Sequence, residues 1–144
     1  MPTIRYQLVQ GLHTDDEIGE LLTRSCVLFA QTLEVPADRI RAFADEVRPE
    51  AAAIGGQLVS DGATEAPFFE FILFQGRPLE HGQQLMAGFT DLLVECLGSD
   101  RSRIRGRVTF VDPDHWSIGG VPASVVRRAD IEARAEAANS AREK

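Results

Sequence analysis

Apolar and polar residues alternate along the first segment of the chain, and Ile4, Tyr6 and Leu8 fall on one side of this alternation. A period of two predicts a half-buried strand over residues 2–10. A more apolar segment over residues 68–74 lies between a proline and a Gln-Gly pair, which predicts another strand. Two further strands are expected over residues 39–47 and 103–111, each after a helix.

The two helices are predicted from apolar residues that recur at intervals of three and four. The first follows Thr14-Asp15-Asp16-Glu17, where Thr14 and Glu17 can form a capping box, and it has to end before Pro36. The second covers residues 80–97, and Gly98 is placed to cap its C-terminus. The inward positions are Ile18, Leu21, Leu22, Cys26, Phe29 and Leu33 in the first helix, and Leu85, Phe89, Leu92, Leu93 and Cys96 in the second.

Several landmarks of the chain occur twice. Pro2 and Pro67 each begin a strand, Gln10-Gly11 and Gln75-Gly76 each end one, and Ile-Gly-Gly follows at residues 54–56 and 118–120. The offsets are 65, 65 and 64 residues. We infer an internal duplication.

Each copy reads as strand, helix, strand, and a helix of this length implies a parallel pair with a right-handed crossover. We therefore predict an α+β fold in which two fused β-α-β units form a four-stranded mixed sheet with two helices on one face. A single domain is expected over residues 1–128, with repeats at 2–56 and 67–124. The tail, residues 129–144, is expected to be a helix, and no chemistry is assigned to it.

Composition narrows the class of protein. The 144 residues are 44% hydrophobic and 26% charged with a net charge of −7, which fits a globular protein and argues against nucleic acid or an anionic membrane as partner. No apolar run is long enough to span a bilayer, and no secretory signal is evident. We expect a cytoplasmic protein. Cys26 and Cys96 fall in helical patterns and are expected to be small core residues.

Pro2 is the candidate for chemistry in the first strand. If Met1 is removed, the chain begins with a secondary amine at the end of a sheet, and burial would lower the pKa of that amine toward neutrality. Such a group can act as a general base. The alternative is a proline that merely begins a strand, where a missing N–H costs nothing.

The second copy carries the sequence from Pro67 to Arg77 and, later, the sequence from Trp116 to Arg128. Together with Met1-Pro2, these segments resemble the tautomerase superfamily, the group of 4-oxalocrotonate tautomerase. The chain is most similar to fused members with two units in one chain, such as the cis-3-chloroacrylic acid dehalogenases and malonate semialdehyde decarboxylases.

The resemblance implies a homotrimer and a small carboxylate substrate, with no cofactor and no metal. Pro2 matches the catalytic amino-terminal proline, and Arg77 and Arg105 match the arginines that bind the substrate carboxylate and stabilise the enolate. Trp116 matches the pocket aromatic. Arg41, which corresponds to Arg105 in the first copy, is a further candidate for substrate binding or a remnant of the duplication.

The sequence also departs from the pattern. Leu12 and Ala52 stand in the first copy where the second has Arg77 and Trp116. Because the nitrogen of Pro67 is an amide, one type of site per chain is expected. Phe74 and Phe29 occupy positions where the cis dehalogenases carry an arginine and a histidine, which makes simple tautomerisation the leading hypothesis.

Several functions stay open at this level. The leading hypothesis is an isomerase that interconverts enol and keto forms of a small 2-oxo acid through Pro2. An enzyme with the same site could instead hydrate or dehalogenate an unsaturated acid, or decarboxylate a 3-oxo acid. A trimeric pseudoenzyme is the alternative if Met1 is retained.

Other polar residues receive structural interpretations. Arg103, Arg105 and Arg107 alternate as on one strand face. The segment from Asp112 to His115 is interpreted as a proline-anchored turn and not as a metal site. His13 and His81 are expected to be exposed at helix starts.

Overall fold

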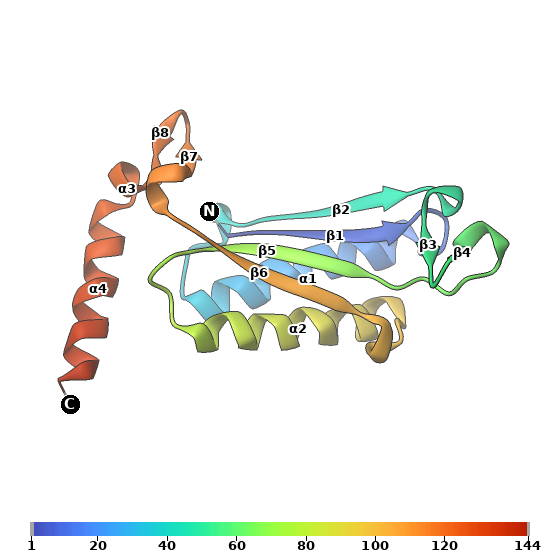
Figure 1. The fold of residues 1–144 in the computed structure, drawn as a ribbon. Helices are drawn as coiled ribbons and strands as arrows, with labels where there is room; N and C mark the ends of the chain where they lie inside the picture. Colours follow the sequence, from blue (N-terminus) through green and yellow to red (C-terminus); the bar gives the residue numbers. More distant parts are fainter. Residues whose placement is uncertain (1, 144) are drawn as a thin grey trace.

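A four-stranded mixed sheet forms the centre of the computed structural model, which describes residues 2–143 (Figure 1). The strand order is β2-β1-β5-β6; β1 and β5 are antiparallel, while β1–β2 and β5–β6 are parallel pairs. The strands are β1 (Thr3–Val9), β2 (Arg41–Val47), β5 (Phe68–Phe74) and β6 (Arg105–Val111). The predicted fold class is confirmed.

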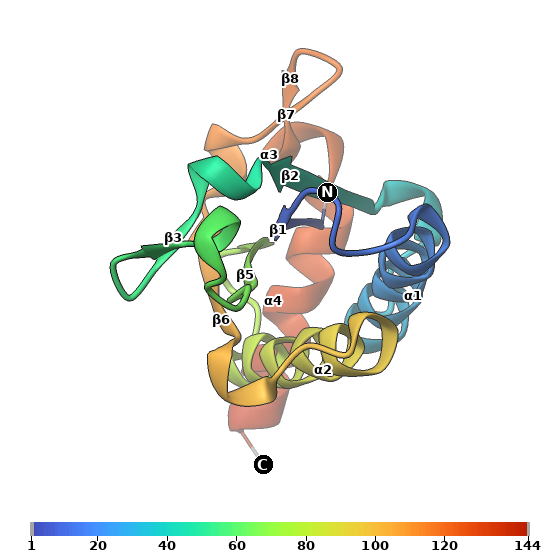
Figure 2. The ribbon, with the colours of Figure 1, turned by 90° about the vertical axis from the view of Figure 1, so that its right-hand side faces the viewer.

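Two helices of equal length cover one face of this sheet (Figures 1 and 2). Helix α1 (Asp15–Leu33) begins with the predicted capping box, in which the side chains of Thr14 and Glu17 each accept a backbone N–H. Helix α2 (Leu79–Leu97) ends at Gly98, whose φ of 66° is the left-handed conformation that suits glycine at this position.

The core lies between the sheet and the helices because each contributes one apolar face. The alternating residues Ile4, Tyr6 and Leu8 of β1 are buried as predicted. Around them, aromatic rings from both copies meet edge to face: the Phe89 ring centroid lies 4.9 Å from that of Phe29 and 5.1 Å from that of Phe71. Such pairs stabilise a core beyond the area they bury.

The smaller elements also recur at an offset of 64 residues. Each Ile-Gly-Gly sequence forms the turn of a two-stranded hairpin that projects from the sheet (Figure 1). The hairpins are β3 (Ala53–Ile54) with β4 (Gln57–Leu58), and β7 (Ser117–Ile118) with β8 (Val121–Pro122); the 3₁₀ helices are η1 (Ala37–Arg39), η2 (Pro49–Ala51), η3 (Val59–Asp61), η4 (Arg101–Arg103) and η5 (Pro113–His115). Arg103 therefore ends η4 and does not share the β6 face, contrary to expectation.

Beyond the second copy, the chain forms the short helix α3 (Ala123–Val126) and then α4 (Arg128–Arg142). Helix α4 stands beside the end of the sheet where β1 begins (Figure 1). It is rich in alanine, which has the highest helix propensity, and none of its residues is fully buried. In residues 2–143, no helix is both long and apolar enough to cross a membrane.

Among residues 2–143, no element covers the sheet face opposite the helices (Figure 1). Phe43 and Phe68 are 49% and 36% exposed, and two ion pairs, Arg5–Asp45 and Arg107–Glu70, link neighbouring strands. Parallel strand pairs are normally covered on both faces. This face is therefore suited to contact another chain.

Candidate active site

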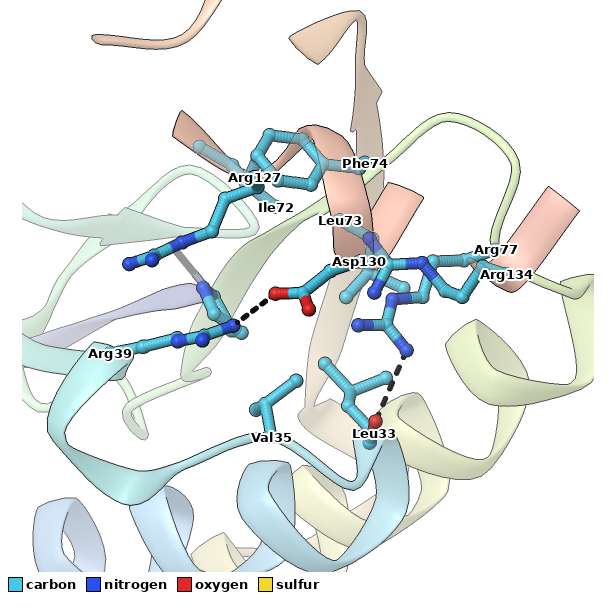
Figure 3. Close-up of a pocket in the computed structure, with 11 residues that line it drawn as sticks. Leu33, Val35, Arg39, Ile72, Leu73, Phe74, Arg77, Arg127, Asp130 and Arg134 are labelled. Atoms are coloured by element: carbon cyan, nitrogen blue, oxygen red, sulfur yellow. Dashed lines mark hydrogen bonds and ion pairs between the residues drawn. The ribbon is translucent and has the colours of Figure 1, made fainter. Parts of the chain in front are cut away.

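A cavity opens at the end of the sheet where β1 begins and α4 stands (Figure 3). It is narrow in the single chain and leaves about 20 Å³ accessible to water. Apolar side chains form its inner wall and charged side chains gather around it. The lining residues come from the residue before β1, the end of α1 and the segment through η1, β5 and the turn after it, and the start of α4: Pro2, Leu33, Val35, Arg39, Ile72, Leu73, Phe74, Arg77, Arg127, Asp130 and Arg134.

Pro2 lies in this cavity because of the antiparallel pairing of β1 and β5. Thr3 is paired with Ile72, so the residue before Thr3 comes beside the end of β5, where Phe74 lines the cavity. Pro2 is buried, and its carbonyl accepts a 3.0 Å hydrogen bond from the Arg41 amide. Met1, whose removal would free the Pro2 nitrogen, lies outside the described residues.

Arg77 reaches the same cavity from the turn after β5. Gly76 adopts a φ of 97°, which turns the chain toward α2. The Arg77 Nη1 donates a 3.2 Å hydrogen bond to the Leu33 carbonyl at the end of α1. Burial, and after it the charge of Arg134, lowers the pKa of Arg77 to about 10, although Asp130 acts in the opposite direction. The structure thus brings Pro2 and Arg77 to one cavity.

Four further charged residues around the cavity were not predicted from the sequence. Arg39 comes from η1 and forms a 2.9 Å ion pair with Asp130 of α4. Arg127 and Arg134 complete the group, and Arg134 is half-buried. A signal was present, because residues 127, 130 and 134 recur at helical spacing and so share one face. Helix α4, for which no chemistry was predicted, therefore forms one wall of the site.

Arg41 and Trp116 lie in a neighbouring hollow. That hollow is joined to the cavity through Arg39 and Arg127, which line both. The Arg41 Nη1 donates to the carbonyls of Asp38 and Ile40, at 2.9 and 3.2 Å. The two residues are thus brought close to the predicted site without lining the cavity at Pro2.

Arg105 lies at the other end of the sheet. It is paired with Phe68 at the start of β5, whereas Pro2 lies beside the end of β5. The Arg105 Nη1 donates to the carbonyls of Ser102 and Ile104, at 2.8 and 3.0 Å, which repeats the bonds of Arg41 in the first copy. Within one chain, Arg105 therefore does not join Pro2 and Arg77, and its part in a site stays a prediction about an assembly.

The corresponding place in the second copy is closed by the chain itself. Glu65, two residues before Pro67, accepts a 2.6 Å hydrogen bond from the Val9 amide and contacts His13 Nε2 at 2.7 Å. The side chains of His13 and Glu65 are 10% and 9% exposed, so the expectation that His13 is exposed is wrong. The segment before Pro67 thus fills the corresponding place in the second copy.

The remaining candidates have structural roles. Asp112 Oδ1 accepts a 2.9 Å bond from the Asp114 amide, so residues 112–115 form the predicted turn. Burial raises the pKa of both cysteine thiols, Cys26 and Cys96, which disfavours the reactive thiolate. His81 is only partly exposed, contrary to expectation. Among residues 2–143, no three His, Cys, Asp or Glu side chains lie close enough to hold a metal.

The cavity therefore combines a buried proline at the start of β1 with four guanidinium groups and one carboxylate. Guanidinium groups pair with carboxylates through two parallel hydrogen bonds, so the cavity is suited to a small organic anion. Fixed positive charges also stabilise negative charge that develops on a bound oxygen. With a free amine at Pro2, this arrangement can bind a carboxylate and move a proton.

Comparison with known sequences identifies relatives for parts of the chain. A family model described as "Tautomerase enzyme" matches residues 67–125. A 2-hydroxymuconate tautomerase of Pseudomonas sp. (strain CF600) is 31% identical over 62 residues, which are 43% of this chain and 98% of that protein. A "Probable tautomerase" of Ralstonia nicotianae is 29% identical over 69 residues, 48% of this chain and 99% of that protein.

Solved structures match across both copies. A native fused 4-OT is 24% identical with a TM-score of 0.79, covering 86% of this chain and 98% of that one. A protein inactivated by 2-oxo-3-pentynoate is 21% identical with a TM-score of 0.78 and the same coverage. A fused 4-OT described as an asymmetric trimer is 21% identical with a TM-score of 0.77, again over 86% and 98%. These likenesses show the fold.

Proposed function

Because this chain belongs to the tautomerase family, as a fused member with two β-α-β units, we propose that it interconverts the enol and keto forms of a small 2-oxo acid. The observation that carries the proposal is the shared cavity of Pro2 and Arg77. Pro2 supplies a proton-transfer group at the position where the family has its amino-terminal proline. Arg77 supplies a cation for the substrate carboxylate.

The proposed reaction needs no group beyond the chain. The Pro2 nitrogen takes the proton of the enol hydroxyl as that oxygen becomes a carbonyl. The conjugated double bonds shift, and the same nitrogen returns a proton to carbon. Arg77 holds the carboxylate and stabilises the charge on the oxygen between the two steps.

The surroundings of Pro2 favour the neutral amine that this reaction requires. The residue is buried, and burial disfavours the cationic form of an amine. The neighbouring guanidinium groups act in the same direction, since like charges oppose protonation. Phe74 occupies the cavity wall and Phe29 lies in the core, so neither position offers a polar group for activating water.

An assembly of three chains is part of the proposal. It is supported by the fused 4-OT neighbour described as a trimer and by the uncovered sheet face that carries Phe43 and Phe68. In such an assembly, Arg105 of one chain can reach the cavity of a neighbouring chain. Arg41 and Trp116 would then border the substrate from the adjoining hollow.

The decisive experiment follows turnover of 2-hydroxymuconate by ultraviolet absorbance in the wild type, Pro2→Ala and Arg77→Ala. We expect each variant to lose roughly 100-fold or more, the usual contribution of a general base or of a fixed cation at the reacting oxygen. Arg142→Ala, an exposed arginine far along α4, is the matched control and should keep its activity. Unchanged turnover in Pro2→Ala would remove the proposed role.

Covalent labelling identifies the reacting atom. The reagent 2-oxo-3-pentynoate should add across its triple bond to the Pro2 nitrogen, so that a new N–C bond forms and the proton passes to the neighbouring carbon. Intact mass should show a chain without Met1 that gains one reagent. The N-terminal peptide should carry the label, which distinguishes Pro2 from Lys144, the single lysine of the chain.

A further inference from the structure

Arg134 occupies an unusual position for an arginine. It is half-buried at the cavity, and burial lowers its pKa. In the part of the chain that the structure describes, no hydrogen bond or ion pair joins Arg134 to another residue. A partly desolvated charge that no direct ion pair neutralises is costly, so this arginine is placed where a bound anion would stabilise it.

Like charges at the same cavity make the position of Arg134 more costly still, and Arg39 is one of them. Arg77 lies close enough for the two guanidinium charges to repel each other, and Figure 3 shows both side chains reaching toward the same space beside Asp130. The Arg77 Nη1 is held by the Leu33 carbonyl, a neutral group that removes no charge. Two like charges therefore face one cavity.

Asp130 relieves this repulsion only in part. Its carboxylate is oriented toward Arg39, with 2.9 Å between Oδ2 and Nη1. It attracts Arg77 and Arg134 at longer range, but forms no ion pair with either. One carboxylate thus serves three arginines, and its contact with Arg39 fixes α4 against the body of the protein.

The two guanidinium groups also stand at a junction. Arg77 and Arg134 line both the cavity at Pro2 and a wider groove that runs outward between α4 and the ends of α1 and α2. A ligand that extends from Pro2 into this groove therefore contacts both arginines. Helix α4 follows the segment matched by the family model, which ends at residue 125.

We propose that Arg134 of α4 is a substrate-binding residue, which together with Arg77 holds a carboxylate of the 2-oxo acid. The inference rests on the proposed function for the identity of the ligand, but not for the existence of an anion site. Asp130 is a positioning residue that acts through Arg39. The charge of Arg134, and not its bulk, carries the effect.

Binding of two matched ligands tests this role without any turnover. Sorbate (hexa-2,4-dienoate) is a planar carboxylate that cannot tautomerise, and hexa-2,4-dienamide is its uncharged counterpart of equal size. Calorimetric titration of the full-length chain should show sorbate binding about 10- to 100-fold more weakly to Arg134→Ala than to the wild type, the loss of one charge-assisted pair. The amide should bind both proteins equally.

Two variants serve as controls. Arg142→Ala lies on the same helix without contact to the cavity and should bind sorbate as the wild type does. Arg134→Lys keeps the charge but loses the planar fork, so its affinity should fall between those of the wild type and Arg134→Ala. The mass of the assembly should be the same in all four proteins.

Each other outcome contradicts the inference. Equal sorbate affinity in Arg134→Ala and wild type, or no sorbate binding by the wild type, removes the anion site. Equal weakening of sorbate and amide, or a changed assembly mass, assigns Arg134 a structural role. If Pro2→Ala kept full turnover while sorbate binding still depended on Arg134, the proposed reaction would fail and the anion site would stand.

Discussion

Arg77 illustrates how single residues set the properties of this cavity. It is half-buried, faces Arg134, and has a neutral carbonyl as its hydrogen-bond acceptor. Its environment therefore favours the uncharged form, and the pKa falls to about 10. In the free protein the unfolded chain binds this proton more tightly than the folded one, so the contribution of Arg77 to stability rises with pH above about 10.

A pH dependence of anion binding follows from that value. Sorbate binds the charged form of Arg77, and its affinity should fall as pH rises through about 10. Between pH 9 and pH 11 we expect the Kd to increase about tenfold, since about one site in ten stays charged at the upper pH. Titrations in buffers of equal ionic strength measure this.

The control for this dependence is Arg77→Ala, which should bind sorbate weakly and with little change over the same pH range. The Arg142→Ala variant should retain the wild-type profile. An Arg77 with the ordinary pKa of an arginine would keep sorbate affinity level to pH 11, and the lowering of its pKa by burial and by Arg134 would be disproved.

At the scale of elements, the two copies share a frame but not a site. Both have the strand, helix and strand in the same order, and Arg41 and Arg105 make the same pair of bonds to the preceding 3₁₀ helix. Pro67, however, is preceded by other residues of the same chain. The side chains of Glu65 and His13 occupy the space next to the start of β5. The chain before Pro67 thus fills the place in the second copy that corresponds to the cavity at Pro2.

The pairing of β5 with β6 depends on a glycine opposite an aromatic ring. A Cβ added to Gly106 would lie 2.1 Å from the Phe69 ring, and Phe69 is buried in the core. Gly106→Ala should therefore lower the free energy of unfolding by about 1–3 kcal/mol, the cost of overpacking. Urea denaturation followed by circular dichroism measures the change.

Gly19 in α1 is the matched comparison, because a Cβ there would meet no atom within 4 Å. Gly19→Ala should raise the free energy of unfolding by about 0.5–1 kcal/mol, the difference in helix propensity. The two substitutions are chemically identical and are expected to have opposite signs. A loss of stability in both variants would disprove the packing argument for β6.

At the scale of the whole molecule, the predicted residues do not all meet in one chain. Pro2 and Arg77 share a cavity, whereas Arg105 lies at the far end of the sheet. The sheet face between these ends is uncovered and carries Phe43 and Phe68. The proposed assembly places another chain on that face, and in the proposal Arg105 approaches the cavity at Pro2 of a neighbouring chain.

Mixing of inactive variants tests this arrangement. Pro2→Ala and Arg105→Ala should each be poorly active alone, and assemblies formed by co-refolding the two should regain up to about a quarter of the wild-type turnover per site. A complete site then combines an intact Pro2 from one chain with an intact Arg105 from another. Sedimentation of the mixture verifies that trimers form.

Recovery should disappear when Pro2→Ala is mixed with Arg77→Ala, because those two residues meet within one chain. If Arg105→Ala were fully active, or if no activity returned in mixed trimers, Arg105 would have no part in a shared site. Arg105 would then have a structural role, through its hydrogen bonds to the carbonyls of Ser102 and Ile104.

Local patterns in the sequence were sufficient for the frame of the fold. The alternation around Ile4, Tyr6 and Leu8, the capping box at Thr14 and the glycine at 98 act over a few residues, and each is found as predicted. Regular elements depend on neighbours along the chain, and such signals can be read without knowledge of the tertiary structure.

The composition of the cavity depended on contacts between distant segments. Arg39 and Asp130 are 91 residues apart and form an ion pair. His13 is buried against Glu65. Helix α4, for which no chemistry was predicted, contributes side chains to the wall of the cavity. From the sequence, Pro2 of the first unit and Arg77 of the second could be predicted to share one site. The tertiary structure alone decided which charges surround them, because electrostatic forces act through space between segments that no local pattern connects.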